Sequence, residues 1–278
     1  MKKLPKLLAF CFTFAVACCS LTACGTYKGE ISNNNIAEYE AGDLAFFTNK
    51  NASYGNTLIS ALNEAIAELG QEKISELISY HNDLIDGKSA TLSFDLPNLS
   101  DNTNGTLVVY SSVDGPPFDY LGKNNEVMGM EIDIIKFAAE KLNKKIETRT
   151  CVFGSLTLMI TQESNEWRMS GVGVRITAER QESVRFCAPY WKMKLNIISK
   201  AEDNFSSITQ LNNKKIGVYN GESGEIYVND KVADGTLSAK TKVVTYTTPQ
   251  TAFQAFLTGK VDAVVCLDYV ADGLIKNR

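Results

Sequence analysis

The segment KKIGVYNGESGEIY, residues 214–227, combines a short apolar strand with a helix that opens at Gly221. The same succession continues on both sides of it along the chain. Short apolar strands that alternate with helices favour mainly parallel sheets covered by helices on both faces. The sequence therefore predicts an α/β protein, with strands at 106–110, 170–174, 195–199, 214–219, 242–246 and 261–266 and further helices at 131–142 and 252–257.

The chain begins with a segment of different character. Lys2, Lys3 and Lys6 precede an apolar run, residues 7–19, that is too short for a comfortable bilayer span, as expected of a secretory signal. Residues 21–24, LTAC, resemble the lipobox of bacterial lipoproteins, in which cleavage precedes the cysteine and lipid is attached to its sulfur. We therefore expect a signal peptide at 1–23, lipidation at Cys24 and an extracytoplasmic protein anchored to a bacterial membrane. The alternative is an ordinary cleavage site after a small residue.

Composition excludes several functional classes. The chain has 278 residues, 44% apolar and 22% charged, with a net charge of −4, which argues against nucleic acid as a partner. The cysteines beyond the signal lack metal-ligand spacing, so we expect small buried side chains and no metal or cofactor. The single histidine, His81, is predicted to be solvated or to cap a helix. These three cysteines are Cys151, Cys187 and Cys266.

Five motifs within residues 106–275 occur in the order typical of one family. Together they resemble the extracellular solute-binding proteins of amino-acid ABC transporters, family 3. The resemblance implies the type II periplasmic-binding-protein fold, in which two α/β lobes close on a small ligand, and a monomer that delivers this ligand to a membrane permease. The motifs are GPPFDYLGKNNEVMGMEIDI (115–134), VFGSL (152–156), GVRITAERQESVRFCAPYW (173–191), KKIGVYNGESGEIY (214–227) and AFLTGKVDAVV (255–265).

The order of the segments departs from the family at the ends. The returning hinge strand and terminal helices that the family places last resemble residues 44–81 here, whereas the chain ends at Arg278. This predicts a circular permutation, with Leu44–Phe47 lying beside Leu195–Ser199 at the hinge; the alternative is a relic of a tandem fusion. The expected segments are a tether and lobe 2 edge strand (24–43), a hinge strand and lobe 1 helices (44–86), a permutation linker (87–105), lobe 1 (106–194), and a hinge strand with lobe 2 (195–278).

The resemblance also implies site residues. Arg180 matches the arginine that grips the ligand carboxylate, a task suited to a planar fork of donors. Phe153 matches an aromatic wall, Phe118 belongs to the first motif, and at Gly173 the backbone is expected to approach the ligand. Glu222 and Ser223 open a helix whose free N–H groups suit an anion. The structural alternatives are a surface arginine at Arg180, core packing at Phe153 and a simple helix cap at Ser223.

Three departures from the family concern the ligand. Gly115 replaces a stacking aromatic, Arg175 replaces a Ser or Thr, and Leu267 stands where an Asp usually pairs with the ammonium. A guanidinium near an ammonium is repulsive. Either Asp268 supplies the acid through a one-residue shift, or the ligand lacks a conventional amino group; Glu222 could neutralise Arg175 or bind a cationic ligand.

The leading hypothesis is thus a binding protein for an amino acid or a related carboxylate, and not an enzyme. No GxxxxGK[ST] loop occurs, so the energy for transport must come from a partner. The alternatives are a dehydratase of the prephenate or arogenate type, which exists on this fold, and a sensory or surface-interaction lipoprotein.

Overall fold

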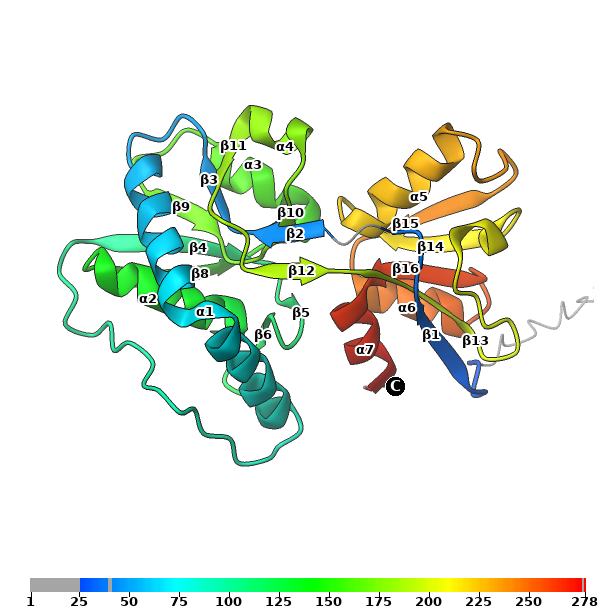
Figure 1. The fold of residues 1–278 in the computed structure, drawn as a ribbon, viewed down its shortest axis with the longest axis horizontal. Helices are drawn as coiled ribbons and strands as arrows, with labels where there is room; N and C mark the ends of the chain where they lie inside the picture. The colour runs from blue at the N-terminus through cyan, green and yellow to red at the C-terminus, as the bar shows by residue number, and fades with distance from the viewer. Residues whose placement is uncertain (1–25, 40–41, 277) are drawn as a thin grey trace, which may run out of the picture.

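Two α/β lobes lie side by side in the computed structural model, which describes residues 26–39, 42–276 and 278 (Figure 1). The chain passes between the lobes twice, just before β2 (Gly42–Ala45) and just after β12 (Trp191–Met193). The predicted signal peptide and Cys24 lie outside the described residues. Within the described part, no helix combines the length and the apolar character needed to span a membrane. The observed architecture is the α/β, two-lobed fold that the sequence predicts.

Lobe 1 is built on a five-stranded sheet. The central strand β4 runs parallel to β8 and β9, whereas β3 pairs antiparallel with both of its neighbours, so the strand order is β11-β3-β9-β4-β8. The buried run Leu107–Ser111 of β4 is covered on both faces, which is typical of a central parallel strand. The elements are β3 (Phe47–Asn49), β4 (Thr106–Ser111), β8 (Lys145–Thr150), β9 (Trp167–Ser170), β11 (Val184–Phe186), α1 (Gly55–Ile85), α2 (Met130–Lys141), α3 (Leu156–Thr161) and α4 (Ala178–Ser183).

Lobe 2 has its own five-stranded sheet, in the order β1-β13-β16-β14-β15. Strands β14, β15 and β16 are parallel, and the antiparallel strands β13 and β1 complete the other edge. The elements are β1 (Ile31–Asn35), β13 (Leu195–Lys200), β14 (Lys215–Tyr219), β15 (Lys242–Tyr246), β16 (Ala263–Leu267), α5 (Ser223–Ala233), α6 (Pro249–Leu257), α7 (Asp268–Lys276) and the short 3-10 helix η2 (Ile208–Leu211).

Short elements complete lobe 1 near the gap between the lobes. Strands β10 and β12 flank β2, and three two- to three-residue strands form a small sheet in the GPPFDY region. They are β5 (Asp114–Gly115), β6 (Asp119–Leu121), β7 (Val127–Met128), β10 (Val174–Arg175) and the 3-10 helix η1 (Phe153–Ser155). Most predicted strands and helices agree with these bounds within three residues; the exception is 170–174, where β9 ends at Ser170.

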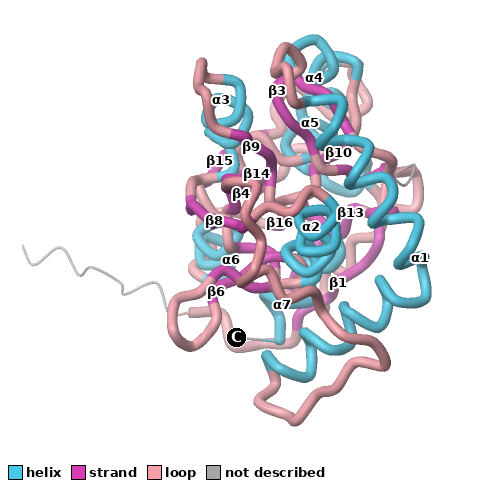
Figure 2. The backbone as a smooth tube through the Cα atoms, turned by 90° about the vertical axis from the view of Figure 1, so that its left-hand side faces the viewer, coloured by secondary structure: helices cyan, strands magenta, loops and turns pink. Residues whose placement is uncertain are grey.

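Helix α1 packs on α2 along one face of lobe 1 (Figure 2). Its helical geometry is interrupted at Gly70, whose φ of 61° lies in the left-handed region that glycine adopts readily. His81, near the end of α1, is 1% exposed, and its Nε2 lies 2.9 Å from Asp133 of α2. The prediction of a solvated or capping histidine was therefore wrong, because Asp133 and Tyr120 provide buried partners for both ring nitrogens.

The segment 87–105 runs from the end of α1 back to β4 as an extended strap with no helix or strand. It is attached to lobe 1 along its length: Glu76 accepts hydrogen bonds from the backbone and hydroxyl of Ser93, and Phe94 packs 6.1 Å from the ring of Phe137. The permutation that this linker would explain stays a prediction.

The pairing at the crossing differs from the expected hinge. Leu44 pairs with Trp191 of β12 and with Arg175 of β10, whereas Leu195–Lys200 pairs with β1 and β16 inside lobe 2. Both apolar runs are buried within the lobes, so the lobes are connected by the residues that flank these runs. The predicted contact between Leu44–Phe47 and Leu195–Ser199 was therefore wrong by a few residues.

Candidate ligand-binding cleft

Arg180 reaches from lobe 1 to lobe 2. It lies in the short helix α4, whose first turn is capped by the Thr177 hydroxyl at 3.2 Å from the Arg180 backbone nitrogen. Its guanidinium donates one hydrogen bond to the Arg175 carbonyl and one to the Gly221 carbonyl of lobe 2, each 2.8 Å long. Burial lowers the pKa of Arg180 from its usual value, and the negative charge of Glu222 raises it again. The N–H donors of the Arg180 guanidinium therefore lie where the two lobes meet.

Glu222 occupies the start of α5 on the opposite side of the cleft. One of its carboxyl oxygens, Oε2, accepts a hydrogen bond of 3.1 Å from the backbone of Gly224, while Oε1 is buried without a partner among the described residues. The side chain is 4% exposed, and burial raises its pKa to about 8 against the opposing effect of Arg180. Glu222 itself therefore caps the helix, at the place where the sequence predicts an external anion; Ser223 beside it is also buried.

Arg175, on β10, lies 5.2 Å from the centre of the Tyr39 ring, close enough for a cation–π contact. The Tyr39 hydroxyl is buried and has no hydrogen-bond partner in the described part of the chain. A Cβ added at Gly42 would lie 2.9 Å from Nε of Arg175, so the Arg175 side chain lies close against the backbone of Gly42. Arg175 thus packs against the segment that crosses to lobe 2.

An aromatic pair closes the cleft on a second side. Phe118 of lobe 1, 2% exposed, stacks on Tyr269 of α7 with ring centres 3.9 Å apart. A Cβ added at Gly115 would lie 3.3 Å from the Tyr269 ring. Glycine at this position, where the family often has an aromatic residue, therefore makes room for a ring supplied by the other lobe.

Phe153 lies against lobe 2 as well. Its ring centre is 5.4 Å from that of Tyr219, and the Tyr219 hydroxyl accepts a hydrogen bond from the Phe153 backbone. The same hydroxyl donates to Asp114 at 2.5 Å. Burial raises the pKa of Asp114. Tyr219 thus joins two loops of lobe 1 to the end of β14.

Behind these residues lie further buried carboxyl groups. Asp119 accepts hydrogen bonds from two hydroxyls and two backbone N–H groups of residues 111–115, and burial raises its pKa to about 6. Glu131 is buried beside Tyr190, whose hydroxyl donates to it. Burial also raises the pKa of Glu131.

Gly173 and Asp268 lie in different surroundings from those expected. The backbone N–H of Gly173 donates to Glu131 at 2.9 Å, and a Cβ added there would overlap the Tyr190 hydroxyl. Tyr190 therefore occupies the space beside Gly173 in which we expected a ligand. Asp268 caps α7 by accepting from the Tyr269 backbone at 2.9 Å, and it lines a separate hollow of about 280 Å³ with Trp191.

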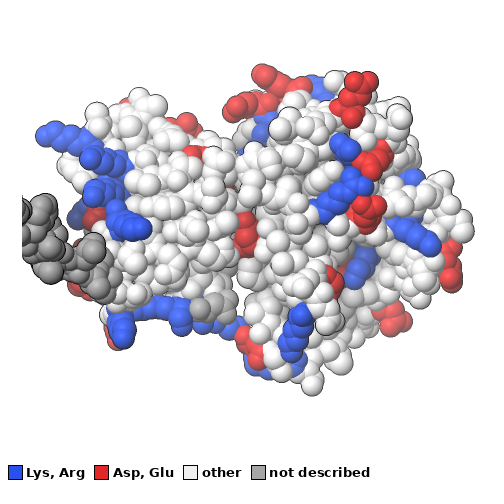
Figure 3. Space-filling view, turned by 180° about the vertical axis from the view of Figure 1, so that it is seen from behind, with Lys and Arg blue, Asp and Glu red and all other residues white. Residues whose placement is uncertain are grey.

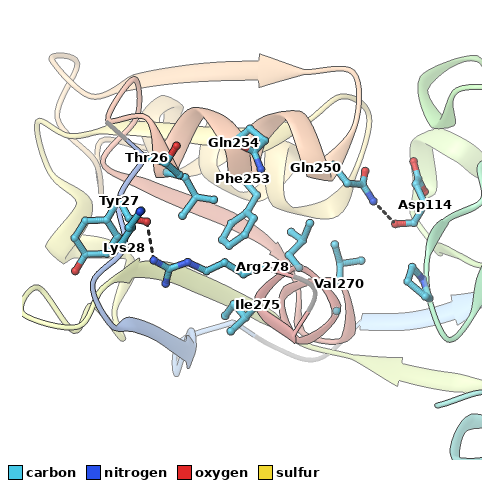
Figure 4. Close-up of a pocket in the computed structure, with 14 residues that line it drawn as sticks. Thr26, Tyr27, Lys28, Asp114, Gln250, Phe253, Gln254, Val270, Ile275 and Arg278 are labelled. Carbon is cyan, nitrogen blue, oxygen red and sulfur yellow. Dashed lines mark hydrogen bonds between the residues drawn. The ribbon is translucent and has the colours of Figure 1, made fainter. Parts of the chain in front are cut away.

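Two cavities are relevant to ligand binding. One of about 370 Å³ is lined by Arg180, Phe153 and Gly221 together with residues of α3, α4 and α5. The other, of about 750 Å³, lies between α6, α7 and residues 26–28 and extends to Asp114 of lobe 1 (Figure 4). Of the predicted ligand-binding residues, only Arg180 and Phe153 line the first cavity, and none lines the second. Because Arg180 and Phe153 line the cavity of about 370 Å³, this cavity is the better candidate for the ligand entrance.

Four residues of the cleft were missed by the sequence analysis: Tyr39, Asp114, Tyr219 and Tyr269. Asp114 and Tyr269 directly adjoin residues that were singled out, so their positions next to Gly115 and Asp268 were an available signal. Tyr39 and Tyr219 carry no local signal, since their roles depend on partners in the other lobe.

Comparison with known proteins gives the family. Residues 107–234 match the bacterial extracellular solute-binding proteins, family 3. The ABC transporter arginine-binding protein 1 of Escherichia coli K12 is 30% identical over 149 residues, which cover 54% of this chain and 58% of that protein. The chain thus spans less than two thirds of this relative's length.

A solved ancestral arginine-binding protein with bound arginine is 31% identical, with a TM-score of 0.55 over 62% of this chain and 74% of that one. The cyclohexadienyl dehydratase of Pseudomonas aeruginosa is 24% identical over 165 residues, 58% of this chain and 59% of that enzyme. With the shared motifs, the two-lobed fold and these similarities, the chain belongs to the bacterial extracellular solute-binding proteins of family 3.

Proposed function

We propose that this protein binds an amino acid between its lobes and delivers it to an ABC permease. The position of Arg180 is the observation that carries the proposal. Its fork of donors faces a cavity between α4 and α5 and at present contacts two backbone carbonyls, which a ligand carboxylate can replace as a stronger, charged acceptor. Relatives described as arginine-binding support an amino acid as the ligand.

Within this class, the charges of the cleft favour an amino acid with a cationic side chain. Four buried carboxyl groups raise the pKa of the Tyr269 hydroxyl, and burial raises the pKa of each of these acids, so a cationic group bound beside them would be stabilised as it draws them into their charged form. Aromatic faces next to carboxylates suit a guanidinium or an ammonium group. The four acids are Asp114, Asp119, Glu131 and Glu222.

The ligand's α-ammonium requires a different partner from the family's. Leu267 replaces the expected acid and is 5% exposed within β16. Asp268 accepts a hydrogen bond from the Tyr269 backbone and lines a separate hollow, away from the cavity that Arg180 lines. We infer that Glu222, through its unpartnered oxygen, takes the place of this acid.

We further propose that the protein is held at the outer face of a bacterial membrane by lipid on Cys24. The lipobox-like LTAC sequence supports this proposal. Family members are extracellular proteins, in agreement with a secretory signal. Two acyl chains bind a membrane far more firmly than one.

Calorimetric titration with arginine, lysine, histidine, glutamine and glutamate tests the ligand assignment. Binding of the cationic amino acids with little response to glutamate is expected. Binding should also raise the melting temperature by mass action. Equal binding of glutamate would contradict the cationic class, and no response to any amino acid would contradict the proposed function itself.

An enzyme of the dehydratase type is a second candidate, favoured by one observation. The pKa of Glu222 is raised to about 8, so that at neutral pH a buried carboxyl group beside an arginine can donate a proton. A similar chain is named cyclohexadienyl dehydratase. Loss of prephenate or arogenate on incubation with the purified protein would establish this activity; unchanged substrate would exclude it.

A further inference from the structure

One edge of lobe 2, remote from the cleft, is rich in lysine. Lys215 begins β14 and Lys242 begins β15, and the two residues are paired in the parallel ladder. Lys260 precedes β16, whose backbone is joined to Lys215 by the hydrogen bond from Asp262. The cleft residues Tyr219 and Glu222 lie at the opposite ends of these strands. We call Lys214, Lys215, Lys240, Lys242 and Lys260 the basic edge.

The basic edge lacks ion-pair partners. Among the described residues, none of its five lysines forms an ion pair, and all except Lys214 are exposed. Lys214 lies 5.5 Å from the centre of the Phe205 ring. The nearest acid, Asp262, accepts a hydrogen bond from the Lys215 backbone. In Figure 3 the blue side chains gather at the outer end of lobe 2, on the left.

Residues 26–31 are fixed at the same end of the lobe. Strand β1 starts at Ile31 opposite Lys200, the last residue of β13, and Tyr27 donates its backbone N–H to Leu257 at the end of α6. Arg278 donates to the carbonyls of Tyr27 and Gly29 at 2.6 and 2.7 Å. Lys28, Lys200 and Arg278 add cations here, against the acids Glu30, Glu202 and Asp203.

We propose that the basic edge rests on anionic phospholipid head groups. The proposal uses the lipid anchor of the proposed function: Cys24 precedes Thr26 by two residues, which span at most about 7 Å. Residues 26–31 and the starts of β14 and β15 lie at the same outer end of lobe 2, so the anchor turns this end toward the membrane, where charges act over roughly 8–10 Å at physiological ionic strength. Lysines at that distance are attracted to a surface of anionic lipid.

The rest of the molecule makes this attraction selective. Cleavage before Cys24 removes three lysines and no acid, which leaves 25 basic and 32 acidic residues, so an anionic surface repels the anchored protein as a whole. The orientation that places the basic edge toward the membrane brings five lysines without ion-pair partners among the described residues to the anionic surface. The contact therefore fixes lobe 2 at the membrane and directs lobe 1 away from it.

Amine labelling of the mature, lipidated protein in vesicles tests the proposal. With phosphatidylglycerol vesicles, acylation of Lys240 and Lys260 should fall several-fold and recover in high salt, while the lobe 1 lysines Lys50 and Lys123 stay reactive. With phosphatidylcholine vesicles no protection is expected. Flotation with phosphatidylcholine reports the lipid anchor separately, and calorimetry with amino acids reports the cleft.

A charge-reversed variant, Lys240→Glu with Lys242→Glu and Lys260→Glu, should lose the difference in acylation of the remaining exposed lysine, Lys215, between the two lipids. The control, Lys50→Glu with Lys123→Glu and Lys145→Glu on lobe 1, changes the net charge equally and should keep it. Equal labelling with both lipids, or equal loss in both variants, would overturn the proposal. Protection of these lysines by a soluble anionic polysaccharide but not by vesicles would overturn it in favour of a cell-wall polymer.

Discussion

Arg180 and Glu222 approach the cleft from different lobes, and each changes the ionisation of the other. Burial lowers the pKa of Arg180, and the Glu222 charge raises it; burial raises the pKa of Glu222 to about 8, and Arg180 lowers it. The site therefore depends on a pair of groups, neither of which is at its ordinary pKa. Substitutions at Arg180, Arg175 and Glu222 test how each of these groups contributes to ligand binding or to stability.

Arg180→Ala should abolish micromolar binding of the amino acid identified by titration. The change removes a charge-assisted contact worth on the order of 2 to 5 kcal/mol. Isothermal calorimetry measures the loss. Arg185→Ala on β11, outside the cleft, is the matched control and should bind normally. Unchanged affinity in Arg180→Ala would remove the central residue of the proposed site.

Arg175→Ser should leave the affinity for a cationic amino acid intact or improve it. The guanidinium packs on Tyr39, 5.2 Å from the ring centre, and its positive charge repels a cationic ligand. Titration beside Arg180→Ala provides the comparison. A fall as large as that of Arg180→Ala would instead indicate a ligand with a second anionic group held by Arg175.

Glu222→Gln should reduce the loss of stability on raising the pH. The pKa of Glu222 is about 8 in the folded protein against a reference value of 4.5, so the folded state holds this proton more tightly between those pH values. Stability contributed by the protonated group is complete below about pH 4.5 and is lost up to pH 8, at no more than about 1.4 kcal/mol per pH unit.

Thermal melting at pH 5 and pH 8 measures this effect. The wild type should lose several degrees more than Glu222→Gln between the two pH values. Glu72→Gln, an exposed change of the same kind on α1, should behave as the wild type. Identical pH dependence in the wild type and Glu222→Gln would show that Glu222 takes up no proton on folding.

At the scale of elements, local pattern was sufficient for most of the fold. The apolar run of β14 and the capped start of α6 at Thr248 are signals carried by neighbouring residues, and both elements occur where they were predicted. The polar segment 87–105 was interpreted as a linker, and its docking through Ser93 to Glu76 was not predicted.

Contacts between distant residues could not be predicted in this way. Tyr219 and Asp114 are 105 residues apart, and Tyr190 and Glu131 are 59 apart. The sequence around Gly173 suggests a glycine that faces the ligand, but in the fold Tyr190 lies beside it. The sequence around His81 suggests a surface histidine, but the packing of α1 on α2 places Asp133 next to it. The motifs located the cleft, but tertiary packing decides which side chains fill it.

Helix α1 provides a test of how firmly residues 44–86 belong to lobe 1. Leu77, beyond the Gly70 kink, is fully buried, and Leu77→Ala should destabilise the protein by about 2 to 5 kcal/mol. Leu158→Ala on α3, where the side chain is 56% exposed, should change stability by no more than about 0.5 kcal/mol. Denaturant unfolding measures both; an equally small effect of Leu77→Ala would indicate that the second half of α1 is only loosely attached.

On the scale of the whole molecule, the two ends of the described chain meet in lobe 2. Arg278 donates hydrogen bonds to the carbonyls of Tyr27 and Gly29. Proximity of this kind is what a circular permutation requires. A reconnected chain would therefore test the predicted permutation directly.

A chain that joins Arg278 to Thr26 through a short glycine-serine linker and opens within residues 87–105 should fold and bind the same ligand. Opening a loop and closing adjacent ends leaves both cores intact. Circular dichroism and calorimetry compare it with the original order. Failure to fold would contradict the permutation and would favour the tandem-fusion origin.

The contacts that already join the lobes have a consequence for transport. Tyr219 donates to Asp114, Arg180 donates to Gly221, and Phe118 stacks on Tyr269, so side chains of the protein itself hold the two lobes together. A ligand shifts the balance between open and closed forms only by its preference for one of them. Each built-in contact raises the share of empty protein that is already shut. If the protein serves an ABC permease as proposed, and this permease recognises the shut form, empty protein would compete with loaded protein, and the transporter would hydrolyse ATP without moving a ligand.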